Sequence, residues 1–297
     1  MPLLYIVATP IGNLGDLTPR AEAALREADV IAAEDTRVTM RLLSHMGIRK
    51  PLVSYHRHNE RNRAPELISR MLAEDLTVAL ASDAGTPAIS DPGSAIVSAA
   101  WRAGIRVVPI CGPSAATCAL SAAGAESAEY AFYGFLPREA KALREKLSRI
   151  RRSGIPVAVL YESPHRIEGL LRALAAEFPR GTVTLCNDLT KRFERIYRGA
   201  PEEVAVELNT NPEASKGEYA LVLDFSGDPG ATDEAAPAAS PEARILEWML
   251  GGDEPREAAE RIVGEGVARN AAYRARLRVE RFLKGAAGAE EGEAGSK

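Results

Sequence analysis

The stretch that decides the fold is Ala81-Ser82-Asp83-Ala84-Gly85-Thr86-Pro87-Ala88-Ile89-Ser90-Asp91-Pro92-Gly93. It follows residues 76–80, a short apolar run with turn residues on both sides, which predicts a buried strand. It precedes residues 94–101, for which we expect a helix. A strand that ends in such a loop leaves backbone N–H groups and small polar side chains at the carboxyl end of a sheet, where open α/β sheets bind ligands. An ordinary strand-to-helix connection is the alternative, and this loop alone leaves both open.

A second loop of this kind occurs at the start of the chain. Residues 3–8 form a predicted strand that runs into residues 9–19, a turn rich in glycine and proline. Thr18 followed by Pro19 is a typical helix start, because the hydroxyl caps free N–H groups and the ring fits the first helical position. The loop has neither the GxxxxGK[ST] nor the G-x-G-x-x-G pattern, so ATP and NAD are poorly supported as ligands.

A third loop follows the predicted strand 105–110. Residues 111–117 open a helix that ends at Gly124, with Ser114 as the expected N-cap. Free N–H groups in the first turn of that helix can receive a carboxylate or a phosphate. Because alternating strands and helices predict a mostly parallel sheet with helices on both faces, the three loops are expected at one sheet edge.

Composition sets the broad class of the protein. The chain has 297 residues, of which 46% are apolar and 26% charged, as in an ordinary soluble globular protein. This length predicts two domains and a smaller part. The formal net charge of −4 argues against wholesale attraction to nucleic acid, although local patches must be considered separately.

The three cysteines, Cys111, Cys118 and Cys186, lack any metal-ligand spacing and are expected to be reduced core residues. No metal site is expected elsewhere, because His56 and His58 cannot face the same way on a helix and no third ligand is near. The N-terminus lacks a basic signal region, and its apolar run is too short to span a bilayer. We therefore expect a cytoplasmic protein without membrane association.

The strand pattern restarts after residue 128, and a basic helix is expected over residues 137–152. On a 3.6-residue repeat, Lys141, Arg144, Arg151 and Arg152 fall on roughly one side of that helix. A solvated helix face is one interpretation. The other, slightly favoured, is a track for the phosphates of a nucleic acid.

Pattern and composition together predict the domain organisation. Residues 1–112 form an N-terminal α/β domain, and residues 113–226 form a second one. Residues 227–240 are an acidic Ala/Pro/Gly linker with nothing to bury. Residues 241–284 suit a small helix-turn-helix module with a basic last helix, and residues 285–297 are expected to be a disordered tail.

Several motifs, read in their order along the chain, resemble those of a known family. They resemble the bacterial 16S ribosomal RNA cytidine ribose 2'-O-methyltransferases of the tetrapyrrole methylase superfamily. The likeness covers residues 3–225, and it rests on Thr9-Pro10-Ile11-Gly12-Asn13-Leu14-Gly15-Asp16, Glu34-Asp35-Thr36-Arg37, Tyr55-His56-Arg57-His58-Asn59-Glu60, the stretch from Ser82 to Gly93, Gly112-Pro113-Ser114-Ala115 and Tyr161-Glu162-Ser163-Pro164-His165-Arg166.

The resemblance implies two α/β domains with S-adenosylmethionine in the cleft between them, a small C-terminal helical module, ribosomal RNA or the small ribosomal subunit as substrate, and a homodimer. It also implies which residues bind the methyl donor. Carried over position by position, they are Pro10, Ser82, Asp83, Ile89, Ser90, Ser114, Ala115, Tyr161, Leu189 and Ala220. Asp91-Pro92-Gly93 is expected to shape the turn into the next helix rather than to contact a ligand.

The remaining candidates concern the methyl acceptor. A ribose hydroxyl is a poor nucleophile at neutral pH, so a proton acceptor would help by about 10²–10⁴-fold. Asp35, Glu162 and Glu218 are the candidates for that role, each of which an ordinary ion pair would also explain. The candidates for RNA binding are Arg37, His56, Arg57, Lys141, Arg144, Arg151, Arg152, Arg166 and Lys216.

Three other functions remain open at this point. A tetrapyrrole methyltransferase of the precorrin type would share the cofactor cleft but would need no basic helix. A non-catalytic RNA-binding protein would account for the basic residues and leave the strand-end loops unexplained. A generic nucleotide-binding α/β protein is the weakest alternative, because the sequence lacks a phosphate-loop fingerprint.

Overall fold

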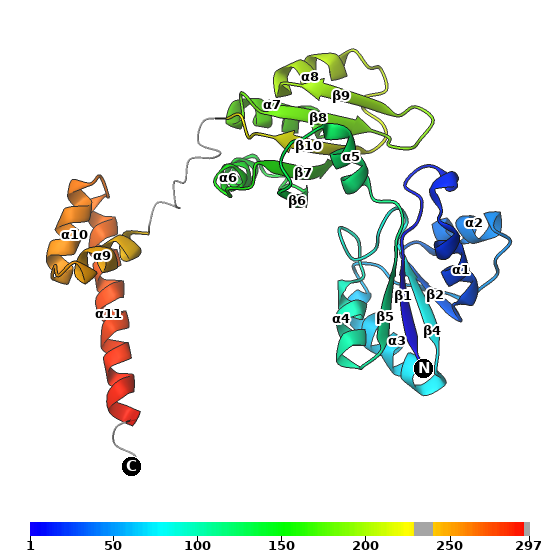
Figure 1. The fold of residues 1–297 in the computed structure, drawn as a ribbon, viewed down its shortest axis with the longest axis horizontal. Coiled ribbons are helices and arrows are strands. Elements are labelled where there is room, and N and C mark those ends of the chain that lie inside the picture. The colour runs from blue at the N-terminus through cyan, green and yellow to red at the C-terminus, as the bar shows by residue number, and fades with distance from the viewer. Residues whose placement is uncertain (229–239, 294–297) are drawn as a thin grey trace. The chain divides into compact units, whose positions relative to one another are not determined.

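The computed structural model describes residues 1–228 and 240–293 and divides into two compact units, Met1–Thr232 and Asp233–Lys297 (Figure 1). Most of the predicted linker, residues 229–239, lies outside the described residues, as do residues 294–297 of the predicted tail. Within the described ranges every helix is too short or too polar to cross a lipid bilayer.

The first unit begins with an all-parallel, five-stranded sheet in the order β3-β2-β4-β1-β5. The β/α alternation of the sequence predicted this arrangement. The elements are β1 (Leu3–Val7), η1 (Leu14–Asp16), α1 (Pro19–Glu27), β2 (Val30–Ala33), α2 (Thr36–His45), β3 (Leu52–Ser54), α3 (Glu60–Glu74), β4 (Thr77–Ala81), α4 (Ser94–Arg102) and β5 (Arg106–Ile110).

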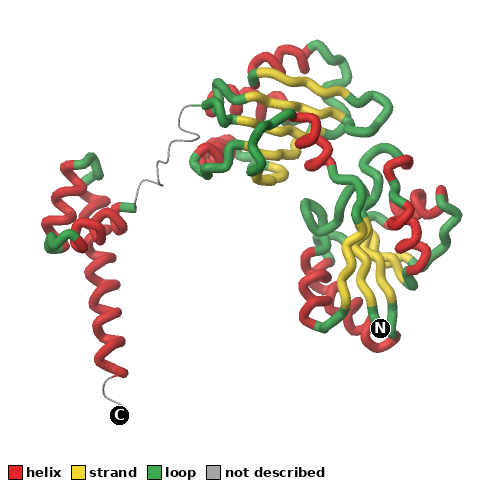
Figure 2. The backbone as a smooth tube through the Cα atoms, in the orientation of Figure 1, coloured by secondary structure: helices red, strands yellow, loops and turns green. Residues whose placement is uncertain are grey.

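The strand register brings the expected loops to one edge. Ala81 at the end of β4 pairs with both Val7 and Ala33, and Val7 also pairs with Ile110 at the end of β5. The loops that follow these strands therefore start level with one another, and Figure 2 shows them at the end of the first sheet that lies toward the second sheet.

Apolar side chains cover both faces of this sheet. One cluster packs α3 and α4 against Leu4 and Leu80, and a second packs α1 against Val7 and Ala79 on the other face. The predicted start of α1 is confirmed, because the Thr18 hydroxyl accepts a hydrogen bond from the Ala21 N–H at 3.1 Å.

The second sheet also has five strands, in the order β6-β7-β10-β8-β9. Only β6 and β7 run parallel, whereas β10 is antiparallel to β7 and β8, and β9 is antiparallel to β8. Its elements are α5 (Ala115–Ala123), β6 (Tyr130–Phe135), α6 (Ala140–Arg151), β7 (Val157–Glu162), α7 (Ile167–Glu177), β8 (Thr182–Asn187), β9 (Arg195–Gly199), α8 (Pro201–Asn209) and β10 (Tyr219–Asp224).

The two faces of the second sheet differ in what covers them. Leu147 of α6, Leu171 of α7 and Val204 of α8 belong to the large cluster on one face. On the other face, Ala119 of α5 belongs to a smaller cluster with Val159 of β7, Cys186 of β8 and Val222 of β10. The fold of two α/β domains followed by a helical module is thus confirmed.

The second unit is a small bundle of α9 (Pro241–Leu250), α10 (Pro255–Gly264) and α11 (Arg269–Glu293). Ile245, Ile262 and Val279, one from each helix, belong to its buried cluster. We expected the module to end at residue 284, but α11 continues to Glu293. Alanine and glutamate, which are strong helix formers, dominate residues 286–293 and explain this difference.

The cysteine expectation was wrong in one respect. All three cysteines are free, and Cys186 is buried, but Cys111 is exposed and Cys118 is half-buried. Cys111 directly follows the last residue of β5, so it belongs to a strand-end loop rather than to the core.

Candidate functional site

Hydrogen bonds tie the three strand-end loops of the first sheet together. Thr9 and Gly85 exchange backbone hydrogen bonds of 2.9 and 3.0 Å, which join the loops after β1 and β4. The Thr86 hydroxyl donates to the Pro113 carbonyl at 3.1 Å and joins the loop after β5. Within the loop after β4, Ala88 has φ of +64°, a left-handed conformation that side-chain-bearing residues rarely adopt. These loops therefore form one fixed surface.

A pocket of about 440 Å³ lies between this surface and the second sheet, a volume typical of small-molecule sites. Most of the residues predicted to bind the methyl donor line it, namely Asp83, Ile89, Ser90, Ser114, Ala115, Tyr161, Leu189 and Ala220. Pro10 and Ser82 do not. Ser82 is buried under the loop, where its hydroxyl donates to the Gly85 carbonyl at 3.3 Å.

Three carboxyl groups, Glu34, Asp83 and Asp91, form an acidic wall on the side of the first domain. Burial is the main cause that raises the pKa of each, and mutual repulsion adds to it between Asp91 and the other two. The Arg57 guanidinium opposes this by lowering the pKa of Asp91 and of Glu34. A cationic ligand would relieve the repulsion. Asp91 thus lines the pocket, contrary to our expectation that it only shapes a turn.

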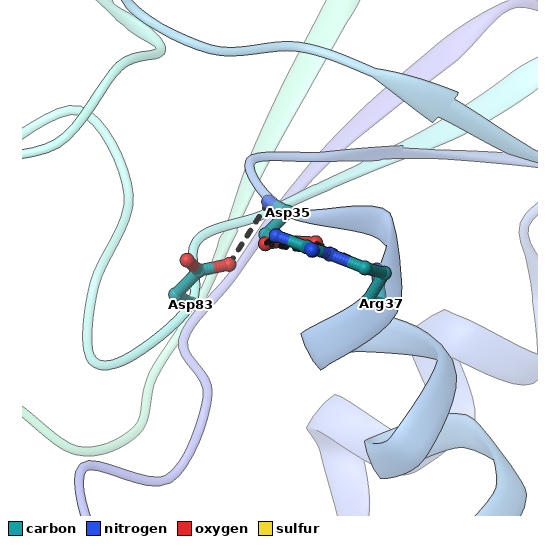
Figure 3. Close-up of polar contacts among 3 residues, drawn as sticks. All are labelled: Asp35, Arg37 and Asp83. Atoms are coloured by element: carbon teal, nitrogen blue, oxygen red, sulfur yellow. Dashed lines mark hydrogen bonds and ion pairs between the residues drawn. The ribbon is translucent and has the colours of Figure 1, made fainter.

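Asp83 and Asp35 lie side by side at the ends of β4 and β2 (Figure 3). The Asp83 carboxylate accepts the Asp35 N–H at 2.9 Å. The Asp35 carboxylate caps α2 and forms a two-pronged ion pair with Arg37, at 3.0 and 2.6 Å. Hydrogen bonds from Arg37 lower the pKa of Asp35 to about 2. Asp35 does not line the pocket, and such a weak base is a poor proton acceptor.

The other two candidate proton acceptors line the pocket but have cationic partners. The Glu162 side chain is 1% exposed, lies 3.1 Å from the Arg166 guanidinium and accepts the Ser163 N–H at 2.7 Å. The Glu218 side chain is 73% exposed and lies 2.8 Å from the Lys191 ammonium. Glu218 is therefore the more accessible of the two.

Apart from Glu162, Ser163 and Glu218, the wall on the side of the second domain is mainly apolar. Tyr161, Cys186, Leu189 and Ala220 come from β7, from β8 and the loop after it, and from β10. Burial raises the pKa of Tyr161, while the Ala116 N–H and the Ser114 side chain act in the opposite direction. Ser114 is the N-cap residue of α5 but its side chain makes no capping hydrogen bond, so the first turn of α5, apart from the Ala116 N–H that contacts Tyr161, can receive an anionic group.

Gly217 holds the rim of this wall. Its φ is +83°, and a Cβ at this position would lie 2.4 Å from a carboxylate oxygen of Asp188. Lys191 bridges Asp188 and Glu218, at 2.8 Å from each. The chain segments after β8 and before β10 are therefore locked together where they meet the pocket.

The residues predicted to bind RNA are scattered, and none of them lines the pocket. Arg37 is exposed and paired with Asp35, while Lys216 is exposed and paired with Glu213 at 2.7 Å. Arg57 donates to the Ser90 carbonyl at 2.6 Å, which ties it to the pocket loop. His56 is half-buried, and its backbone N–H donates a hydrogen bond to the Asn59 side-chain oxygen at 2.8 Å.

The basic helix is confirmed as α6, but its face differs from the prediction at one position. Lys141, Arg144 and Arg152 are exposed, whereas Arg151 turns toward the protein. Its guanidinium donates to the Glu177 carbonyl and lies 5.9 Å from the centre of the Phe178 ring. Arg151 neighbours the buried Ile150 and therefore lies at the edge of the packed face of the helix.

Arg166 is likewise an internal residue. Besides its ion pair with Glu162, it donates to the carbonyls of Leu136 and Pro137 at 3.1 Å each. It therefore fixes the segment between β6 and α6 instead of reaching outward. The two residues differ from the prediction for the same reason. Each guanidinium donates hydrogen bonds to backbone carbonyls at the end of a helix or strand, which the sequence does not show.

Glu34, Asp91 and Phe135 are among the pocket residues that the sequence-based predictions did not include. Glu34 directly precedes a candidate that we did consider, and Asp91 lies within the opening stretch. Glu34 and Phe135 lie at the ends of strands, a signal that was available in the sequence. In the part of the chain that the structure describes, no group of three His, Cys, Asp or Glu side chains could hold a metal ion.

The pocket fits the methyl donor that the resemblance implies. S-adenosylmethionine carries a sulfonium and an ammonium group, which suit the acidic wall of Glu34, Asp83 and Asp91. Its carboxylate suits the N-terminus of α5, and its adenine suits the apolar wall around Tyr161. The residues present therefore suit the cationic groups, the carboxylate and the adenine of the molecule.

Comparison with known proteins bears on the family. The family model described as Tetrapyrrole (Corrin/Porphyrin) Methylases matches residues 3–205. A protein of Neisseria meningitidis serogroup B, named ribosomal RNA small subunit methyltransferase I, is 41% identical over 263 residues, which cover 89% of each chain. Proteins of the same name are 41% identical in Xylella fastidiosa, over 91% of this chain and 97% of that protein, and 44% identical in Vibrio cholerae, over 77% and 79%.

Solved structures share the fold at lower identity. A diphthine synthase matches with a TM-score of 0.58 and 19% identity, covering 75% of this chain and 89% of that one. A uroporphyrin-III-C-methyltransferase from Thermus thermophilus matches with a TM-score of 0.50 and 21% identity, covering 76% and 95%. At these identities the likeness shows the fold and leaves the substrate open.

Proposed function

The chain belongs to the tetrapyrrole (corrin/porphyrin) methylases, and from this premise we propose that it methylates the ribose 2'-hydroxyl of a cytidine in small-subunit ribosomal RNA. As a member of that family it is a methyltransferase that uses S-adenosylmethionine. The observation that carries the choice of substrate is the 41% identity to a ribosomal RNA small subunit methyltransferase I over 89% of both chains. That likeness extends past residue 205, where the family model ends.

In the proposed reaction the protein binds the methyl donor, aligns the acceptor oxygen with the methyl group and excludes water. When bound, S-adenosylmethionine supplies a methyl group on a positively charged sulfur, so little activation is needed from side chains. Asp83 and its neighbours in the acidic wall hold the cationic part, and Ser114 and Ala115 at the start of α5 hold the carboxylate. Fixing the acceptor oxygen in line with the methyl group can contribute roughly 7–11 kcal/mol.

The proton of the ribose hydroxyl needs an acceptor. Among the three candidates, we propose Glu218, because it lines the pocket and its carboxylate remains exposed. Glu162 is enclosed by Arg166 and Ser163, which supports a structural role for it. Asp35 has a pKa of about 2 and lies outside the pocket lining.

The RNA would approach along α6. Lys141, Arg144 and Arg152 are exposed on that helix, which follows β6 at the pocket. Such cations neutralise backbone phosphates and release counterions, so binding should weaken as the salt concentration rises.

A homodimer and a cytoplasmic location are further parts of this proposal. The first is tested by light scattering of the purified full chain, and the second by fractionation of cells.

Ribosomal RNA from cells with and without the protein tests the proposal. Alkaline hydrolysis cleaves RNA next to every free 2'-hydroxyl, so a 2'-O-methyl group appears as a missing cleavage that depends on the protein. Mass spectrometry of the resistant dinucleotide then identifies the base. Methylation of a base instead of a ribose would contradict the reaction, and transfer to a cobalt precorrin with ribosomal subunits inert would favour a tetrapyrrole substrate.

A further inference from the structure

A β-bulge in β6 turns Phe135 toward the pocket. Phe132 pairs with Val159 of β7, but Gly134 pairs with Leu160 and Phe135 with Tyr161, so Tyr133 is an extra residue. Side chains alternate along a regular strand, and residues 132 and 135 would then face opposite ways. The bulge places Phe135 on the side of Phe132 and Tyr161, and Gly134 accommodates it with φ of +60°. Bulges often redirect side chains at functional sites.

The segment that carries the ring is fixed in place. Leu136, the next residue, is 3% exposed in the large cluster on the opposite face of the sheet. Arg166 holds the carbonyls of Leu136 and Pro137, and its ion pair with the buried Glu162 holds it in turn. The Phe135 ring lies edge-on to Tyr161, with ring centres 5.8 Å apart.

The ring nevertheless lacks a partner on its outer face. Phe135 lines the pocket and is 59% exposed, although a phenylalanine buries well in a core. A rigid, exposed aromatic ring in a ligand pocket indicates a flat apolar partner. Ile89, 63% exposed on the loop after β4, lines the same pocket from the first domain.

We propose that Phe135 is the platform on which the base of the methylated nucleotide stacks. This inference rests on the proposed function and adds to it the contact that positions the acceptor nucleotide. Proteins recognise unpaired bases by stacking them on aromatic rings. The exposed cations Lys141 and Arg144 on α6, which follows β6, would receive the adjoining phosphates.

Substitutions at Phe135 test the platform, with small ribosomal subunits as methyl acceptor and the full chain as enzyme. Phe135→Ala is expected to lower kcat/KM for the subunits by about 5- to 150-fold, as loss of a base–aromatic stack implies. Phe135→Trp should keep activity within about threefold, because tryptophan retains a flat ring. Phe135→Leu should resemble alanine. S-adenosylmethionine affinity by calorimetry and the melting temperature should remain unchanged throughout.

Phe193→Ala is the matched control. Phe193 is a phenylalanine of the same domain, 73% exposed, outside the pocket lining. Its substitution should leave kcat/KM for the subunits unaltered.

Three results would overturn the inference. Activity of Phe135→Leu equal to the wild type would show that only apolar bulk matters. An equal loss of S-adenosylmethionine affinity in Phe135→Ala would place the ring against the methyl donor. A change of oligomeric state in Phe135→Ala would place it between copies of the chain. If the wild type binds S-adenosylmethionine and methylates no subunit, the proposed function itself fails, which is a separate outcome.

Discussion

Asp83→Asn separates the charge of the acidic wall from its hydrogen bonding. The Asp83 carboxylate accepts the Asp35 N–H at 2.9 Å, and an asparagine oxygen can accept the same bond. The substitution therefore keeps the loop geometry and removes one negative charge beside Glu34 and Asp91. No large change of volume accompanies it.

The loss of charge should weaken S-adenosylmethionine binding. A hydrogen bond to a charged group contributes roughly 1.5–3 kcal/mol, so the Kd should rise by about 13- to 160-fold. The affinity of the wild type should also fall as the pH is lowered. Because burial raises the pKa of Asp83, Glu34 and Asp91, that fall begins at a higher pH than for ordinary carboxyl groups.

The stability of the free protein should change in the opposite direction. The folded-state pKa of Asp83 lies above its unfolded value, so the folded protein holds this proton more tightly. The favourable contribution of the carboxyl to folding is complete below the unfolded pKa and is lost as the pH rises through the folded pKa. At pH 7 the charge therefore destabilises the free protein, and Asp83→Asn should melt at a higher temperature.

Two measurements between pH 5 and 8, at about four pH values, check these expectations. Calorimetry gives the Kd of S-adenosylmethionine, and thermal melts give the melting temperature of the free protein. The gain in melting temperature should shrink as the pH falls toward the raised folded-state pKa of Asp83. A Kd within about twofold of the wild type would refute the role of Asp83. A lower melting temperature of Asp83→Asn at pH 7 would refute the claim that the charge of Asp83 destabilises the free protein.

Three further substitutions follow from the contacts. Asp35→Asn should change the methylation rate by less than about threefold, because its ion pair keeps its pKa at about 2 and it cannot supply the 10²–10⁴-fold of a general base. Arg166→Met should lower the free energy of unfolding by about 3–5 kcal/mol in urea titrations, because it leaves the buried Glu162 unpaired. Gly217→Ala should lower the melting temperature and S-adenosylmethionine affinity together, because its Cβ would lie 2.4 Å from the Asp188 carboxylate.

Each of these has a control. A methylation rate about a hundredfold lower in Asp35→Asn, the size of effect that a general base gives, would identify Asp35 as the proton acceptor. Arg166→Met combined with Glu162→Gln should recover most of the lost stability, and a loss that persists would assign the effect to the freed carbonyls. Gly154 has φ of +75° with nothing within 4 Å, so Gly154→Ala measures the backbone cost alone and should be milder than Gly217→Ala.

Much of the fold could be predicted because the signals are local. A hydroxyl followed by a proline begins a helix at Thr18 whatever lies elsewhere, and the apolar runs of β1, β4 and β5 mark strands by themselves. Parallel pairing of such strands brings their carboxyl ends together, which is why Asp83, Ile89, Ser90, Ser114 and Ala115, predicted from the resemblance, line one pocket.

The second sheet shows where local signals stop. The position of β10, antiparallel between β7 and β8, depends on pairing between segments far apart in the chain. The sequence does not mark β9 as a strand, because it carries three polar or glycine residues among five and has no continuous apolar run. Arg151 and Arg166 were assigned to RNA because the sequence records their charge and not the carbonyls that they meet.

By itself, the sequence determined the strand-end loops, the helix starts and the α/β class, and the resemblance that it carries pointed to the cofactor. Only the tertiary structure decided that Glu34, Asp83 and Asp91 form one acidic wall, that Arg166 fixes the segment after β6, and that a bulge turns Phe135 into the pocket. The reason is physical. Capping and periodicity act over a few neighbouring residues, whereas repulsion between charges, ion pairing and side-chain direction depend on groups that meet only once the chain has folded.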